Sequence, residues 1–128
     1  MFAAIAANTV FWFVPLFALA LVKLLLPVAS VRTFITRILM GIGENWISVN
    51  TWLFRTFASI DWRLDGGDQL RRDEWYLVMA NHQTWVDILV LQTAFNRRIP
   101  FLKFFIKQQL IWFPVLGFAW WAMDMPFM

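Results

Sequence analysis

The chain has 128 residues, enough for one small domain at most, and it is 61% hydrophobic but only 15% charged. A net charge of +3 is too small to predict a nucleic acid partner, and the absence of cysteine excludes disulfides, a thiolate nucleophile and a cysteine-based metal site. Nine tryptophans and fourteen phenylalanines are typical of a protein at a membrane interface, so the expected partner is membrane lipid.

The first apolar stretch, Phe2–Val22, contains no charged residue. About 20 apolar residues suffice to cross a hydrocarbon core, so this stretch predicts a transmembrane helix. A secretory signal peptide is the alternative, but its charged region would be expected before the apolar stretch. Instead Lys23, Arg32 and Arg37 follow the stretch. Positive residues mark the cytoplasmic side, so the rest of the chain is expected in the cytoplasm.

The segment Ser30–Ile60 predicts a second, amphipathic helix. Its apolar residues recur in steps of three and four: Ile35, Ile38, Leu39, Ile42, Trp46, Val49, Leu53, Phe57 and Ile60. The opposite face carries Arg37, Glu44, Ser48, Thr51 and Arg55, and Gly41 and Gly43 predict a bend. This helix would lie in the membrane interface or pack on the first helix; a core helix of a soluble part is the alternative.

The composition changes abruptly in the segment from Asp61 to Glu74, which has five acidic residues and three arginines. We therefore expect membrane-anchoring helices over residues 1–60 and a second domain over 61–128. Three short runs in that domain predict strands, namely Trp62–Asp65, Trp75–Ala80 and Ile99–Leu102. Two predict helices, namely Ile88–Phe95 and Lys107–Met123, the latter interrupted around Pro114 and Gly117. Alternating strands and helices predict an α/β fold with some parallel strand pairing.

The segment Ala80–Asp87 carries the clearest chemical signal. It holds the single histidine, His82, and Asp87 at the start of an apolar run. Thr84 followed by Asp87 matches a capping box, so Asp87 could serve only as a helix cap and His82 could be an ordinary loop residue. In the functional interpretation Asp87 orients the imidazole and His82 takes a proton from a substrate hydroxyl. One histidine without cysteine supplies too few ligands for catalytic zinc, so no metal is expected.

The pattern Asn81-His82-x-Thr84-x-x-Asp87 resembles the histidine-aspartate motif of the glycerolipid acyltransferase family. The segment Lys107–Gly117 resembles that family's second block. The residues of both segments are most similar to those of bacterial inner-membrane members of the lysocardiolipin-acyltransferase-like branch. The resemblance implies that His82 is the general base and Asp87 its partner, in an acyltransferase of phospholipid biosynthesis. It further implies acyl-CoA or acyl-carrier protein as donor, a lysophospholipid such as lysophosphatidate as acceptor, and no cofactor. Lys107 would contact the acceptor phosphate, or would simply be a solvated helix residue.

The chain departs from the family at one point. The family carries a Pro-Glu-Gly-Thr-Arg run that helps to hold the acceptor phosphate, and this sequence has none. We therefore expect an N-terminal fragment of a longer acyltransferase, or the product of a truncated gene, that is inactive by itself. The alternative is a non-catalytic, membrane-anchored protein that binds lipid or another protein.

Overall fold

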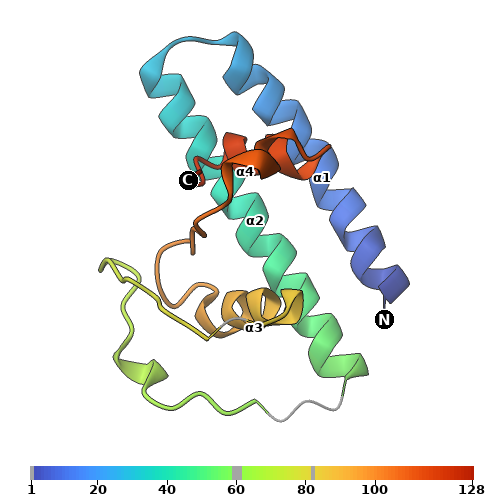
Figure 1. Cartoon of the computed structure of the whole chain (residues 1–128), viewed down its shortest axis with the longest axis vertical. Coiled ribbons are helices and arrows are strands. Elements are labelled where there is room, and N and C mark those ends of the chain that lie inside the picture. Colours follow the sequence, from blue (N-terminus) through green and yellow to red (C-terminus); the bar gives the residue numbers. More distant parts are fainter. Residues whose placement is uncertain (1, 59–61, 82) are drawn as a thin grey trace.

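A computed structural model describes residues 2–58, 62–81 and 83–128. Its helices, in chain order, are α1 (Phe2–Leu25), α2 (Ala29–Phe57), the short 3-10 helix η1 (Gly67–Gln69), α3 (Trp85–Phe95), the 3-10 helix η2 (Gln108–Trp112) and α4 (Leu116–Ala122). The two long helices form an antiparallel hairpin, and α3, α4 and the connecting segments lie beside it (Figure 1).

The hairpin confirms the two helices that the first sixty residues predict. Pro27 lies in the turn between them, and a proline disfavours helical geometry in the residue before it, which explains why α1 stops there. Polar side chains join the helices near both ends. Asn8 Nδ2 donates to Asn50 Oδ1 at 2.9 Å, and Lys23 Nζ donates to Thr36 Oγ1 at 2.8 Å.

The core lies where α4 packs against the hairpin. Its buried members are Leu16, Ala20, Ile35, Leu39, Ile42, Ile106, Ala119, Ala122, Met123 and Met125. Phe118 of α4 contacts Phe17 of α1, with 5.4 Å between ring centroids. Gly117 allows the tight turn from η2 into α4, because a Cβ there would lie 2.1 Å from the carbonyl oxygen of Ile111. The interruption predicted near Pro114 is confirmed, since η2 ends before it and α4 begins after it.

The predicted polar face of α2 needs correction. The helix runs without interruption through Gly41 and Gly43, and the Phe101 ring packs on Gly43, where a Cβ would lie only 2.8 Å from the ring. Glu44 is only 9% exposed, although its position in the sequence placed it on the open face. A segment far along the chain covers Glu44. The periodicity of apolar residues within one helix does not indicate which distant segment will pack on that helix.

The predicted α/β fold is wrong: the described residues form helices and no strand. A strand needs a neighbouring strand to satisfy its backbone groups, and in the described part of the chain Trp62–Asp65, Trp75–Ala80 and Ile99–Leu102 have none. The run at 75–80 is not buried either, since Trp75, Leu77 and Met79 are 92%, 77% and 86% exposed. The β-type pairing that the structure does describe is one isolated parallel bridge, between Ile106 and Phe127.

Among the described residues, one helix is long and apolar enough to cross a membrane. It covers Ala3–Leu25, with a mean hydropathy of 2.1. By length and composition this helix supports association of the chain with a membrane.

Candidate active site

The predicted catalytic pair belongs to the segment that enters α3. His82 lies outside the described residues. Asp87 is half-buried in the first turn of α3, and its Oδ2 accepts hydrogen bonds from the backbone N–H groups of Gln83 at 2.8 Å and Thr84 at 2.6 Å. The predicted capping box between Thr84 and Asp87 is confirmed, with Thr84 as the N-cap residue. The aspartate is therefore held at a defined place at the start of α3.

The cap does not exclude the catalytic interpretation. A carboxylate has about four lone-pair sites on its two oxygens, so capping a helix does not by its chemistry prevent it from accepting a further hydrogen bond. A side chain fixed by two backbone donors has one orientation, which is what a residue that orients an imidazole requires. One aspartate can thus start the helix and also serve as the partner of a histidine that precedes it in the sequence.

Three side-chain contacts fix α3 against α2. Thr51 donates to Thr93 at 3.2 Å. At the end of α3, Asn96 Nδ2 donates to Ser48 Oγ at 2.8 Å and more weakly to the backbone oxygen of Glu44 at 3.4 Å. Asp87 lies in the first turn of α3, and Asn96 caps its other end. These contacts therefore fix the position of α3, and with it that of Asp87, relative to the hairpin.

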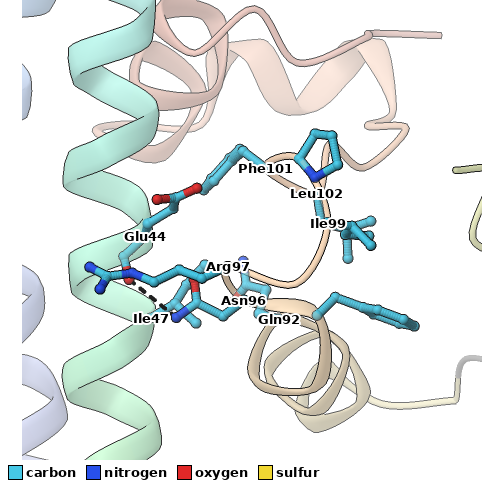
Figure 2. Close-up of a pocket in the computed structure, with 10 residues that line it drawn as sticks. Glu44, Ile47, Gln92, Asn96, Arg97, Ile99, Phe101 and Leu102 are labelled. Carbon is cyan, nitrogen blue, oxygen red and sulfur yellow. Dashed lines mark hydrogen bonds between the residues drawn. The ribbon is translucent and has the colours of Figure 1, made fainter. Parts of the chain in front are cut away.

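A small pocket marks this junction of α2 and α3 (Figure 2). Its volume is about 220 Å³, including space open to solvent. Glu44 and Ile47 line it from α2, Gln92 from α3, Asn96 from the C-cap of α3, and Ile99–Leu102 from the segment that follows. Figure 2 shows the Glu44 carboxylate on the side of Phe101, away from Asn96. Arg72 Nη2 reaches both oxygens of Glu44, at 2.7 and 2.8 Å, and so neutralises a nearly buried charge.

Sequence reasoning missed this junction. The sequence pattern predicts Glu44 on the polar face of the second helix and gives Asn96 no role, yet Asn96 bonds to Ser48 and to the Glu44 backbone and so joins α3 to α2. Asn96 could have indicated this contact from the sequence, because the side chain of an asparagine at a helix end can bond to nearby backbone groups. Nothing in the sequence pairs Arg72 with Glu44, which lies 28 residues earlier.

A second hollow is lined mainly by apolar side chains. It measures about 510 Å³, including space open to solvent, and is lined by Leu70, Tyr76, Leu77, Val78, Met79, Phe95 and Ile99. These residues come from the segment just before the candidate motif and from the end of α3. The Tyr76 hydroxyl is bonded to the backbone N–H of Arg71 and to Glu74, so the polar tip of this residue has its own partners.

Lys107 stands apart from the candidate pair. It is exposed and precedes η2, which packs on α4, whereas α3 packs on α2. Its backbone oxygen accepts from Leu110 N–H at 2.9 Å. No contact that the structure describes tests the predicted role of Lys107 in phosphate binding, which stays a prediction.

A buried ion pair between Lys23 and Asp124 holds the C-terminal part of the chain, which includes Lys107, against the hairpin. Lys23 of α1 is 2% exposed and donates to Thr36 Oγ1, to the backbone oxygen of Ala122 and to Asp124 Oδ1, all within 2.8 Å. Burial acts to raise the pKa of Asp124, but hydrogen bonds from Lys23 and Thr36, with the charges of Lys23 and Lys103, outweigh it and hold the pKa below 3.8. The Lys23 side chain is therefore buried and bonded within the protein, and it is not a solvated charge beside the apolar stretch.

The described residues contain no group of three or more histidine, cysteine, aspartate or glutamate side chains that could hold a metal ion. Comparison with protein-family models matches residues 62–128 to the family described as Acyltransferase. No curated protein and no solved structure matches the chain.

Proposed function

Because the chain belongs to the glycerolipid acyltransferase family, we propose that it transfers a fatty acyl group from acyl-CoA or acyl-carrier protein to a hydroxyl of a lysophospholipid such as lysophosphatidate. His82 is the general base in this proposal and Asp87 orients it. The observation that carries the assignment is the position of Asp87, which the backbone N–H groups of Gln83 and Thr84 hold at the start of α3.

The chemistry needs a base but no protein nucleophile. In the proposed reaction His82 removes the proton from the acceptor hydroxyl while that oxygen attacks the thioester carbonyl of the donor. The C–S bond breaks, the new ester forms, and the proton leaves with the thiol. Asp87 stabilises the imidazolium that forms in between, as a carboxylate next to a histidine does.

Other parts of the chain suit the two substrates. The apolar hollow of Leu70, Tyr76–Met79, Phe95 and Ile99 has the lining that an acyl chain requires. Lys107 is exposed and positively charged, which suits an acceptor phosphate. We place residues 1–60 as the membrane anchor and 61–128 as the first part of the catalytic domain, on the cytoplasmic face of a bacterial inner membrane, where soluble acyl donors are available.

The test uses membranes that contain the protein expressed from its full reading frame, assayed with a panel of lysophospholipids and radiolabelled acyl-CoA or acyl-carrier protein. His82→Ala should lower the rate by roughly 10²–10⁴, the usual contribution of a general base. Asp73→Asn is the matched control, because Asp73 is an exposed carboxylate that pairs with Arg71 on the surface. Full activity of a folded His82→Ala protein would refute the mechanism.

Asp87→Asn separates its two roles. Asparagine can still cap a helix, so a purely structural aspartate predicts nearly normal activity and a small loss of stability. An orienting aspartate predicts a fall in kcat of orders of magnitude in a protein that remains folded, because a neutral amide does not stabilise the imidazolium. Thermal unfolding of the same preparation distinguishes the two results.

A further inference from the structure

One turn of α2 contacts the chain on both sides of the candidate motif. Before the motif, Arg72 Nη2 donates to both carboxylate oxygens of Glu44, at 2.7 and 2.8 Å. After the motif, Asn96 Nδ2 donates to Ser48 Oγ at 2.8 Å and to the backbone oxygen of Glu44 at 3.4 Å (Figure 2). Both ends of the segment 72–96 are therefore bonded to the same turn of α2. We call these four residues the α2 clamp.

The run that leads from Arg72 to α3 is loosely packed. Its side chains at Trp75, Leu77 and Met79 are 92%, 77% and 86% exposed, so packing contributes little to their position. The helix α3 that follows packs on α2. The position of Asp87, in the first turn of α3, therefore depends on α2 from both directions along the chain.

The contacts of the α2 clamp have a defined geometry. The Glu44 side chain is only 12% exposed, so solvent screens its charge less than that of a surface carboxylate, and Arg72 is attracted to one place on α2. The Asn96 amide donates to a side chain and to a carbonyl of the same helix. An ion pair and hydrogen bonds determine both distance and orientation, whereas contacts between apolar side chains are not directional.

We propose that Glu44 and Ser48 are positioning residues for the acyl transfer proposed above, on which this inference rests. They act through Arg72 and Asn96, which place the start of α3, and Asp87 with it, for the reaction. A misplacement of about 1 Å at the reacting groups can lower a rate by about a hundredfold, so contacts at this distance from the chemistry are able to affect it. The helix α2 then belongs to the catalytic unit and does more than anchor it.

Steady-state kinetics of the full reading frame, purified in a non-ionic detergent, test the proposal. Arg72→Met releases one end of the segment and Asn96→Ala releases the other. Each should lower kcat by about tenfold to a hundredfold and change KM for donor and acceptor by less than about threefold, because the substrates still bind while the reacting groups are displaced. Arg71→Met is the matched control, since the neighbouring arginine pairs with Asp73 on the surface, and kcat should stay within about twofold.

Two further variants separate positioning from stability, because Arg72→Met also leaves the Glu44 carboxylate unpaired. The double variant Glu44→Met with Arg72→Met replaces the ion pair by apolar side chains, a change that commonly preserves stability but removes the directional contact. A positioning role predicts that kcat stays low in this stable variant, whereas a purely structural role predicts that kcat recovers with stability. Arg72→Lys should recover most of kcat, because a single nitrogen makes both contacts with Glu44.

A distance measurement tests the α2 clamp without any reaction, and the chain suits it because it contains no cysteine. Trp52→Cys on α2 and Val86→Cys at the start of α3 replace side chains that are each 60% exposed, and both carry nitroxide labels. Double electron–electron resonance then gives the distribution of distances between the labels. This distribution should shift or broaden in the double methionine variant and in Asn96→Ala, but not in Arg71→Met.

The proposal is overturned if the variants at both ends keep the native kcat, or if the activity of the double methionine variant returns with its stability. Distance distributions that match the native one would also overturn it. These results refute only the positioning role, because the native chain is active in them. A native chain that transfers no acyl group to any acceptor would instead refute the proposed function, and the positioning role with it.

Discussion

The junction of Lys23, Thr36 and Asp124 allows one prediction to be worked out in detail. Its partners differ in burial, since the Lys23 side chain is 2% exposed and that of Asp124 is 52% exposed. Removing the aspartate charge with Asp124→Asn leaves a buried cation without its counter-charge. Removing the lysine charge with Lys23→Met leaves a carboxylate that water reaches and to which Thr36 still donates. The two substitutions should therefore have unequal effects.

The burial values set the magnitudes. Breaking a fully buried ion pair by removing one partner costs about 3–5 kcal/mol. Asp124 is half exposed, and asparagine retains an oxygen that accepts from Lys23, so we expect a loss of about 1–3 kcal/mol for Asp124→Asn. Lys23→Met should cost about 1 kcal/mol or less, and the double variant should resemble Lys23→Met. The control Asp73→Asn removes an exposed pair and should change stability by less than about 0.5 kcal/mol.

Denaturant unfolding in a non-ionic detergent, followed by far-UV circular dichroism, measures these differences at pH 7. Acid provides a second measurement. Because the pKa of Asp124 is lower in the folded state, its contribution is present above the unfolded value of 3.8 and is lost as the pH falls through the folded pKa. The stability difference between the native chain and Asp124→Asn should therefore shrink with acid. A larger loss for Lys23→Met than for Asp124→Asn would refute the reasoning.

Three further outcomes follow from the packing. Gly117→Ala should lower the free energy of unfolding by about 1–3 kcal/mol, since its Cβ would clash with the Ile111 carbonyl; equal stability would show that the α4 turn can move. Gly41→Ala should instead raise it by about 0.5–1 kcal/mol, because nothing lies within 4 Å of the added methyl group and alanine favours a helix. Arg72→Met should cost about 2–3 kcal/mol and Glu44→Gln only about 1 kcal/mol, since the former leaves a nearly buried carboxylate unpaired. The same unfolding assay checks all three.

The helices were predictable because their signals are local. The apolar content of α1, the three-and-four spacing of α2 and the Thr84–Asp87 capping box at α3 each lie within one helix or at its boundary. The strands were not, because strand formation depends on a partner elsewhere in the chain. The run at 75–80 has the composition of a buried strand but no neighbour, while Ile106 and Phe127 form a bridge from segments that carried no strand signal.

The candidate site was predictable in part for the same reason. The spacing of Thr84 and Asp87 indicated the cap that the structure describes, whereas the role of Asp87 towards His82 stays a prediction. The contacts that position the site were not predictable, since they join residues far apart in the sequence. Asn96 contacts α2 across 48 residues, and Lys23 meets Asp124 across 101.

The polar contacts at the two ends of the hairpin have a consequence for how its helices find their alignment. Apolar helix faces slide past each other with little penalty, but a slip of one turn would move both contacts at once. Asn8 would then face Trp46 or Phe54 instead of Asn50, and Lys23 would face Arg32 or Met40 instead of Thr36. Each wrong register would leave a polar or charged group unpaired in the interface. The two contacts, one near each end, therefore favour one register for the whole hairpin.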